Sequence, residues 1–406
     1  MKILLSAYAC EPNKGSEPEV GWKWATTLSK LGHDVHVLTR SNNKQIIEEY
    51  LSKNRIDRLN FVYFDFPNWI LKIIKGESNP NSYLYFLLWQ LGVFFKSKKL
   101  VNDINFDFIH HVTFVSLRYP SFLCLHNIPF IFGPISGGDR IPDQLKKNFS
   151  FESKFKEFLR DLSNKYIKFS PLMNLTFSNS FKIFVNSEAT KKLIPSKYHF
   201  KTEELLAIGT DYFPITLNDN VKNNVKFSIC YAGNLLNLKG LLIAIKTFKQ
   251  VKKINDNAIF TVIGTGPLES KLKELAKEYL IEDSIIWLGK INREKLFNIF
   301  KVSDLMLIPS LRDSGGFVIL EAMTCGLPVA TLNIGGPGKI VNNECGIKIN
   351  VSNKNEDQIV NELSSQINDL IKDNEKLKYK KIKSLERAKD FNWKDKVSKV
   401  YNFNQI

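Results

Sequence analysis

One stretch, residues 303–340, constrains the fold more than any other part of the chain. It contains two short apolar runs, 305–308 and 329–332, which are separated by a polar, glycine-bearing loop and by a helix-like segment that ends at Gly326 and Pro328. Apolar runs of this length are typical of strands buried in a parallel sheet. The stretch therefore predicts consecutive strand, loop, helix and strand elements of an α/β protein.

The loop of this stretch is suited to binding a ligand. Ligands of open α/β sheets bind beyond the carboxyl ends of the strands, where a helix N-terminus attracts phosphate. Gly315 and Gly316 let the backbone approach such a ligand closely. Asp313 precedes the expected helix and Glu321 lies two turns into it. We expect one carboxylate at the mouth of a cleft and the other near deeper polar groups, such as sugar hydroxyls.

The rest of the chain repeats the same alternation of strands and helices. At the N-terminus, the strand 2–9 precedes a helix that Ser16 and Glu19 open with a capping-box pattern, and a second strand follows at 34–39. No G-x-G-x-x-G fingerprint accompanies this unit, which argues against a dinucleotide site. The chain of 406 residues is long enough for two domains. We predict two Rossmann-like parallel-sheet domains, 1–218 and 219–387.

Charge narrows the classes of partner. The chain has a net charge of +16, and residues 140–201 carry thirteen Lys and Arg against five Asp and Glu. Such a local excess indicates an anionic partner. No zinc-ligand spacing, helix-turn-helix or aromatic-basic motif accompanies it, so we expect a membrane surface and no nucleic acid. The segment 69–75 and the basic 140–201 region are the candidates for that contact, whereas the helix around Leu87 is expected in the core.

The cysteines and the N-terminus indicate a compartment. Five cysteines are scattered without a C-x-x-C pair, as is typical of buried, reduced thiols in a cytosolic protein. The apolar run at the N-terminus is short and ends in a turn, so it is expected to be a first strand, not a signal peptide. We expect a cytoplasmic protein that can associate peripherally with the inner face of the membrane.

A resemblance to a known family supports this interpretation. Asp313, seven intervening residues, Glu321-Ala-Met and the later run Cys-Gly-Leu-Pro-Val resemble the motif of family-4 glycosyltransferases of the GT-B fold, where the pattern is Glu-x7-Glu. The resemblance implies two Rossmann-like domains that face each other across a cleft, with a C-terminal segment, 388–406, that returns to the first domain. Asp313 is one methylene shorter than the usual Glu.

The resemblance also implies a donor site for a nucleoside-diphosphate sugar. It places Asp313 near the transferred sugar, Glu321 at the ribose and Lys239 at the diphosphate, with Asn234 where the family has Arg. Arg312 or the amides of the following glycines could supply the missing charge. The predicted donor-binding residues are Lys239, Asn234, Gly264, Gly266, Arg312, Ser314, Gly315, Gly316, Phe317 and Glu321.

In the N-terminal domain, the family has a His near the reacting sugar carbon, at a strand's carboxyl end. His110 is the first choice for this role and His111 the second, since a neutral imidazole can orient a sugar hydroxyl. The expected acceptor or cleft residues are Gly15, Ser16, Glu17, His111, Gly137 and Gly138. For Glu17, stabilisation of the helix N-terminus is an equally good explanation.

The sequence therefore predicts a retaining glycosyltransferase that acts on a glycan or lipid-linked glycan in bacterial surface-polysaccharide synthesis. No Asp-x-Asp triplet occurs, so neither a metal nor a cofactor beyond the sugar donor is expected. Two alternatives stay open: a sugar-nucleotide epimerase of the same architecture, and a non-catalytic binding subunit, which Asn234 and Asp313 would favour.

Overall fold

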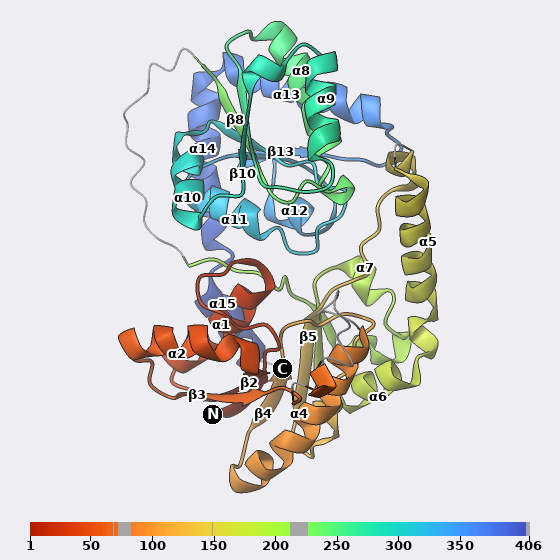
Figure 1. The fold of residues 1–406 in the computed structure, drawn as a ribbon, viewed down its shortest axis with the longest axis vertical. Coiled ribbons are helices and arrows are strands. Elements are labelled where there is room, and N and C mark those ends of the chain that lie inside the picture. The colour runs from red at the N-terminus through yellow and green to blue at the C-terminus, as the bar shows by residue number, and fades with distance from the viewer. Residues whose placement is uncertain (68, 72–82, 148, 212–225, 403–406) are drawn as a thin grey trace. The chain divides into compact units, whose positions relative to one another are not determined.

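The computed structural model describes residues 1–406 except 68, 72–82, 148, 212–225 and 403–406. The described chain forms two compact units (Figure 1). The first unit comprises Met1–Gly138, Phe158–Gly209 and Trp393–Ile406, and the second comprises Asp139–Glu157 and Thr210–Asn392. The predicted boundary at 218–224 lies outside the described residues, as does most of the segment 69–75.

The first unit is built on a seven-stranded sheet in which all neighbouring strands are parallel. In chain order its strands are β1 (Lys2–Ser6), β2 (Asp34–Arg40), β3 (Leu59–Phe64), β4 (Phe108–His111), β5 (Phe130–Ile135), β6 (Ser180–Val185) and β7 (Thr202–Glu204). The spatial order is β3-β2-β1-β4-β5-β6-β7, so the order reverses between β1 and β4. Such a switch point is where open α/β sheets bind ligands.

The second unit repeats this design with six parallel strands. They are β8 (Ser228–Ala232), β9 (Ile259–Ile263), β10 (Ile285–Gly289), β11 (Leu305–Leu307), β12 (Val329–Leu332) and β13 (Gly346–Ile349). Their spatial order, β10-β9-β8-β11-β12-β13, places the switch point between β8 and β11. The two Rossmann-like parallel sheets confirm the predicted fold class.

Helices connect these strands, as parallel neighbours require. In the first unit they are α1 (Ser16–Lys30), α2 (Lys44–Lys53), α4 (Tyr83–Asp103), α6 (Pro171–Asn179), α7 (Glu188–Lys191) and α15 (Trp393–Tyr401). In the second they are α8 (Leu241–Ile254), α9 (Glu269–Glu278), α10 (Arg293–Val302), α11 (Phe317–Thr324), α12 (Gly335–Ile340), α13 (Glu356–Lys372) and α14 (Asn374–Lys389). Residues of α5 (Phe151–Tyr166) belong to both units.

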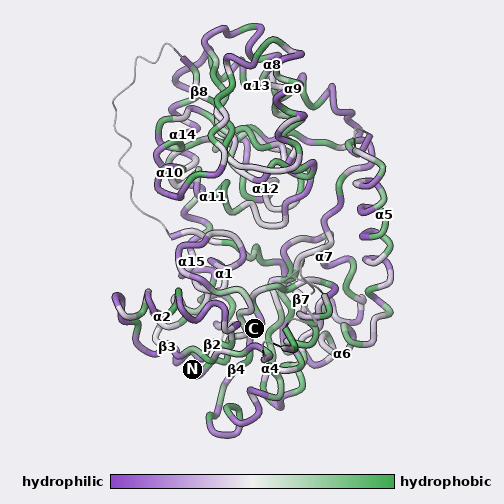
Figure 2. The backbone as a smooth tube through the Cα atoms, viewed as in Figure 1, coloured by the Kyte–Doolittle hydropathy of each residue, from purple (hydrophilic) through white to green (hydrophobic). Residues whose placement is uncertain are grey.

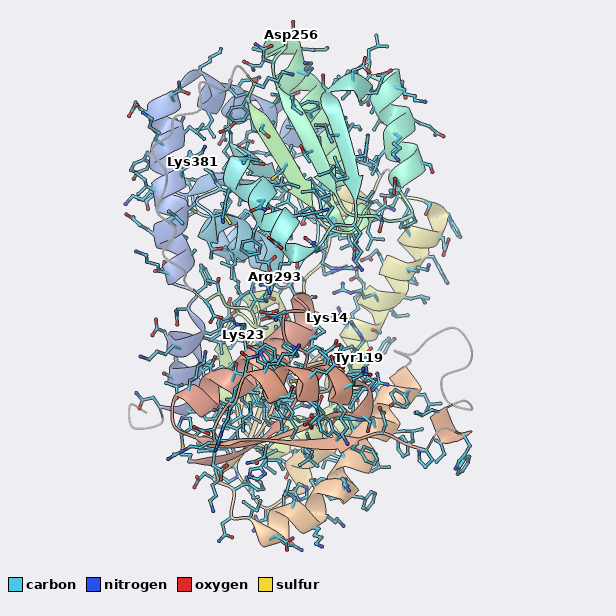
Figure 3. The ribbon with its side chains drawn as sticks, turned by 60° about the vertical axis from the view of Figure 1, so that its left-hand side comes forward. Lys14, Lys23, Tyr119, Asp256, Arg293 and Lys381 are labelled. Carbon is cyan, nitrogen blue, oxygen red and sulfur yellow. The ribbon has the colours of Figure 1, made fainter. Side chains whose placement is uncertain are left out.

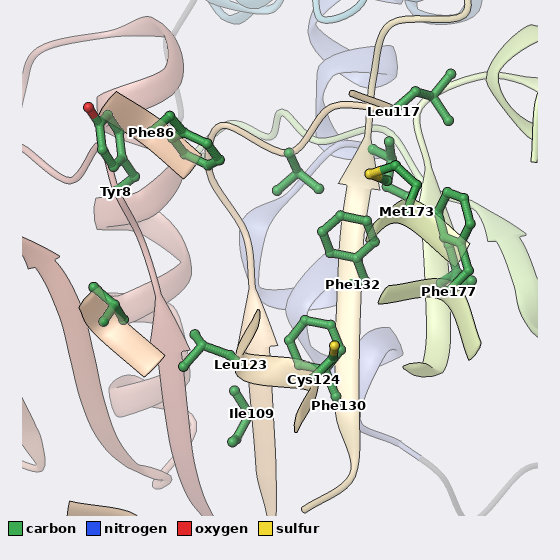
Figure 4. Packing of buried hydrophobic residues seen from close by; sticks show 14 of the residues in the cluster. Tyr8, Phe86, Ile109, Leu117, Leu123, Cys124, Phe130, Phe132, Met173 and Phe177 are labelled. Atoms are coloured by element: carbon green, nitrogen blue, oxygen red, sulfur yellow. The ribbon is translucent and has the colours of Figure 1, made fainter. Parts of the chain in front are cut away.

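An aromatic-rich core stabilises the first unit. Phe130 and Phe132 of β5 are fully buried together with Phe177 of α6 (Figure 4). Trp89 of α4 belongs to the same cluster and is also fully buried. The expectation that the helix around Leu87 belongs to the core is confirmed, because Tyr85, Phe86, Trp89 and Val93 of α4 are all buried. All five cysteines lie among the described residues, and each is buried and unpaired.

The start of α1 differs from the predicted capping box. Gly15 is the N-cap residue, and the helix has no side-chain cap. Ser16 lies at the first helical position with φ of 55°, so its hydroxyl is not the cap that the pattern predicted. Of the two bonds of a capping box, only the one from the N-cap amide to the Glu side chain forms: Glu19 Oε2 accepts from the Gly15 amide at 3.1 Å. The buried Glu19 carboxylate therefore closes this helix start.

Candidate active site

Three loops meet at the carboxyl ends of β8, β9 and β11 in the second unit. The Leu235 amide donates to Thr265 O at 3.0 Å, and the Leu311 amide donates to Leu238 O at 2.9 Å. Gly264 and Gly266, which were predicted to face a nucleotide, make this packing possible. A Cβ on Gly264 would lie 2.0 Å from Gly233 O, and a Cβ on Gly266 would lie 2.6 Å from Leu235 O. Larger residues at either position would separate the loops.

Lys239 and Asp313 form an ion pair across these loops. Lys239 ends the short 3₁₀ helix Asn237–Lys239, and its Nζ lies 2.5 Å from Asp313 Oδ2. Both side chains are largely shielded, with 22% and 14% of their surfaces exposed, so the attraction is screened less than in a surface pair. The predicted convergence of residues 239 and 313 is thus present in the structure.

The second carboxylate oxygen of Asp313 closes the loop that precedes α11. Oδ1 accepts from the amides of Gly315 at 3.2 Å and Gly316 at 3.1 Å. Gly316, with φ of 82°, is the N-cap residue, a conformation that favours glycine, and the helix has no side-chain cap. The two glycine amides that the sequence suggested as phosphate donors therefore bond to Asp313.

The neighbours of Asp313 bond to residues far away in the sequence. Arg312 forms an ion pair with Glu157, and the Ser314 hydroxyl donates to Asp139 Oδ2 at 3.1 Å. Both acidic partners belong to the segment Asp139–Glu157 of the second unit. No motif in the sequence pointed to these two acidic residues, because no spacing links residues about 155 or more positions apart.

Glu321 pairs with Arg293. Arg293 Nη2 lies 2.8 Å from Glu321 Oε1, and the carboxylate is largely shielded, with 12% of its side chain exposed. Arg293 is the first residue of α10 (Figure 3). It was not among the predicted site residues, although its position after β10 and Gly289 places it beyond the carboxyl end of a strand. Phe317, the first residue of α11, is half-buried one turn before Glu321.

Asn234 is exposed at the position where a cation was expected. The main-chain carbonyl oxygen of Asn234 accepts a hydrogen bond from the Tyr231 hydroxyl at 3.1 Å. Burial, together with the charge of Asp313, raises the pKa of Tyr231, so this phenol stays neutral. In the described loops around Asp313, the cation that pairs with its carboxylate is Lys239.

In the first unit, His110, which was predicted to lie near the reacting sugar carbon, is a core residue. The ring is fully buried, and its two nitrogens bond to Tyr401 Oη at 2.6 Å and Gly133 O at 2.8 Å. Burial lowers the pKa of His110 to about 3. A neutral ring with both nitrogens bonded inside the core has no atom left to contact a sugar, so His110 holds α15 against β4 and β5.

His111 is equally buried, and burial lowers its pKa to about 4. Its Nε2 lies 3.0 Å from Thr113 O, and its Nδ1 has no partner among the described residues. Because a carbonyl can only accept, Nε2 carries the proton and Nδ1 is the acceptor. The geometry gives His111 no exposed surface for a ligand.

The remaining predicted residues lie at the loops that follow β1, β4 and β5 of the first unit. The exposed Glu17 accepts from the Phe114 amide at 2.6 Å, which ties the start of α1 to the loop after β4. Gly137 O accepts from Arg160 and Asn164, and the Gly138 amide donates to Thr190 Oγ1 at 3.2 Å. These loops therefore form one bonded rim at the carboxyl edge of the sheet.

Two kinds of feature are absent from the described part of the chain. No group of three or more His, Cys, Asp and Glu side chains is arranged to hold a metal ion. No described helix is both long enough and apolar enough to cross a membrane.

Comparisons with known proteins cover nearly the whole chain. The family model described as "Glycosyltransferase Family 4" matches residues 22–208, and the model described as "Glycosyl transferases group 1" matches residues 214–384. N-acetyl-alpha-D-glucosaminyl L-malate synthase of Bacillus anthracis is 24% identical over 364 residues, which are 84% of this chain and 81% of that protein.

Solved structures share the fold over the full length. Sucrose-phosphate synthase from Thermosynechococcus elongatus has a TM-score of 0.66 at 16% identity, covering 100% of this chain and 98% of that chain. Anabaena HepE, solved in complex with UDP and glucose, has a TM-score of 0.61 at 15% identity, covering 100% of this chain and 99% of that one. At these identities the likeness establishes the fold alone.

Proposed function

From its membership of the family-4, GT-B glycosyltransferases, which the two family models and the shared fold establish, we propose that this enzyme is a retaining transferase. It moves a sugar from a nucleoside-diphosphate sugar to a hydroxyl of a glycan or lipid-linked glycan. Its setting is the synthesis of a bacterial surface polysaccharide at an anionic membrane face. The donor binds the second unit and the acceptor binds the first.

One observation carries the donor assignment: the Lys239–Asp313 pair at the switch point of the second sheet. A leaving diphosphate develops negative charge as its bond to the sugar breaks, and a positioned ammonium stabilises that charge. Lys239 is held beside the loop that precedes α11, where an anionic ligand and a helix N-terminus favour each other. Arg293 and Glu321 then form the ribose end of the same site.

The geometry favours a reaction in which the substrate supplies the base. His110 and His111 are buried, and Asp313 already accepts from one ammonium and two amides. In the proposed step the bond between the anomeric carbon and the diphosphate oxygen breaks. The acceptor oxygen forms its bond on the same face, and its proton passes to the departing diphosphate. No side chain is oxidised, reduced or covalently modified.

Ligand-induced stabilisation tests the donor site. UDP-, GDP-, ADP- and dTDP-sugars are added to the purified chain, and the free energy of unfolding is followed by thermal shift. A ligand at about a hundredfold above its Kd stabilises the folded chain by about 2.7 kcal/mol. We expect one base to stabilise the wild type and Lys239→Ala to abolish the effect. The absence of stabilisation by every donor, or full stabilisation of Lys239→Ala, would contradict the proposal.

The same preparation separates transfer from epimerisation. Incubation with the donor alone leaves the sugar configuration unchanged if the enzyme is a transferase, whereas an epimerase releases an altered sugar without any acceptor. The anomeric configuration of the product, read by NMR, tests retention. An inverted linkage would exclude the same-face step.

A further inference from the structure

Helix α5 turns its apolar side toward solvent. Six large apolar side chains on this helix, Phe151, Phe155, Phe158, Leu159, Leu162 and Tyr166, are between 38% and 85% exposed. At 3.6 residues per turn they form one continuous stripe. Phe169, just beyond the helix, is 77% exposed. Green and purple segments alternate along α5, because hydrophobic and hydrophilic residues alternate at helical spacing (Figure 2). An exposed apolar patch of this size marks an interaction site.

The opposite side of α5 is polar, and hydrogen bonds hold it inward. Glu157 pairs with Arg312, and Ser153 accepts from Asn237 Nδ2 at 3.4 Å, all within the second unit. In the first unit, the Arg160 guanidinium and the Asn164 amide both donate to Gly137 O, at 2.8 Å and 3.0 Å. In each unit these bonds hold the polar side of the α5 residues that belong to that unit, so their apolar side chains cannot turn inward without breaking them.

Lysines border the stripe on both sides. Lys154 and Lys165 follow one edge of the stripe, and Lys156 lies at the other edge, where it pairs with the exposed Glu152; all three lysines are exposed. An aromatic stripe with lysines at its edges favours the interface of an anionic bilayer. Two copies of this chain would each bring a net charge of +16, which opposes self-association.

We propose that α5 is the membrane-docking element of this protein. The aromatic stripe inserts at the boundary between headgroups and acyl chains of an anionic bilayer, and the bordering lysines contact the phosphates. This inference concerns lipid binding and stands independently of sugar transfer, so the two can fail separately.

Vesicle sedimentation tests the proposal. The full chain is mixed with vesicles of phosphatidylcholine, with or without phosphatidylglycerol. We expect binding to the anionic vesicles, and Phe155→Gln/Phe158→Gln should raise the dissociation constant at least about tenfold. The matched control, Ile254→Gln/Leu280→Gln, removes two apolar side chains of the second unit that are more exposed than Phe155 and Phe158, and it should leave binding unchanged. Lys154→Gln/Lys165→Gln should weaken anionic-vesicle binding by about twentyfold or more.

A fluorescence measurement tests the same proposal if the Gln variants of α5 fold poorly. Phe158→Trp keeps an aromatic residue in the stripe, and brominated lipid should quench its emission beyond the quenching of the wild type. The absence of anionic-vesicle binding, or equal losses in the α5 and control variants, would overturn the proposal. So would a stable dimer that the α5 variant dissolves, since a second copy would then cover the stripe.

Discussion

Replacing His110 or Tyr401 should affect stability and leave catalysis intact. Gly133 O can only accept, so His110 Nε2 carries the proton and donates to it at 2.8 Å. His110 Nδ1 must then accept from the Tyr401 hydroxyl, 2.6 Å away. His110 has no exposed surface, and only 6% of Tyr401 is exposed. Water therefore has little access to replace either bond.

The magnitudes follow from the groups that each variant leaves unpaired. A buried polar group without a partner costs about 2 kcal/mol. Tyr401→Phe leaves only the imidazole nitrogen unpaired and should cost about 2 kcal/mol. His110→Phe leaves both the Gly133 carbonyl and the Tyr401 hydroxyl unpaired and should cost about twice that. The double variant leaves only the carbonyl, so we expect a coupling of roughly 2–4 kcal/mol between the two sites.

Urea unfolding followed by tryptophan fluorescence measures these costs. Trp24 and Trp393 lie in the first unit, and the Trp24 ring packs edge-on against His110 at 5.0 Å, so fluorescence reports this region. At a temperature where all variants are folded, kcat should change less than about twofold, because neither side chain touches substrate. A His110→Phe variant with wild-type stability and a hundredfold loss of kcat would refute this reasoning and would show that His110 takes part in the reaction.

The remaining predictions concern the donor loops and acid or base titration. Asp313→Ala should lower stability by about 1–2 kcal/mol, because the Gly315 and Gly316 amides lose their acceptor, and it should abolish transfer. Asp313→Asn keeps the Oδ1 acceptor and should lose transfer with a smaller stability change, as thermal melts and a transfer assay would reveal. Arg293→Ala should raise the donor KM about fivefold at unchanged kcat, and an equal fall in kcat would argue that Arg293 acts in the transition state. Burial lowers the pKa of His110 to about 3 and of His111 to about 4. Both rings therefore contribute stability above pH 6.5 that is lost as pH falls toward 4, by up to about 1.4 kcal/mol per pH unit for each ring. His111→Leu should reduce the acid-side slope when the free energy of unfolding is plotted against pH. Burial and the nearby Lys399 lower the pKa of Lys396 to about 7, so stability should rise between pH 7 and pH 10 and Lys396→Met should remove that rise.

Local spacing was sufficient to predict the elements that carry the donor site. Strand β11, the Gly-rich loop and α11 follow each other within about twenty residues, and their apolar periods and glycines predicted them. The resemblance to the glycosyltransferase motif placed Lys239 and Asp313 at one donor site, and in the structure both follow strands of one parallel sheet and form an ion pair. Such strands bring their carboxyl ends to one edge.

Long-range packing explains what the sequence did not reveal. His110 looked accessible because it ends a strand, yet Tyr401, 291 residues later, covers it through α15. The capping box at Ser16 fitted the pattern, but the backbone places Gly15 at the cap position. Partners such as Asp139 and Arg293 follow from tertiary contacts that no local pattern encodes.

Helix α5 shows most clearly that a local sequence pattern does not determine which face of a helix is buried. Its sequence predicts a basic amphipathic helix, and the ordinary expectation is that the apolar face packs on the core. The same period of about 3.6 residues fits a helix whose apolar face is buried and one whose apolar face is exposed. Only the bonding partners of the polar face decide which orientation α5 adopts. Glu157 and Ser153 contact Arg312 and Asn237 within the loops that also hold Lys239 and Asp313. The bonds that turn the aromatic stripe outward therefore also join α5 to the donor loops, and a change at Glu157 should alter both lipid binding and donor affinity.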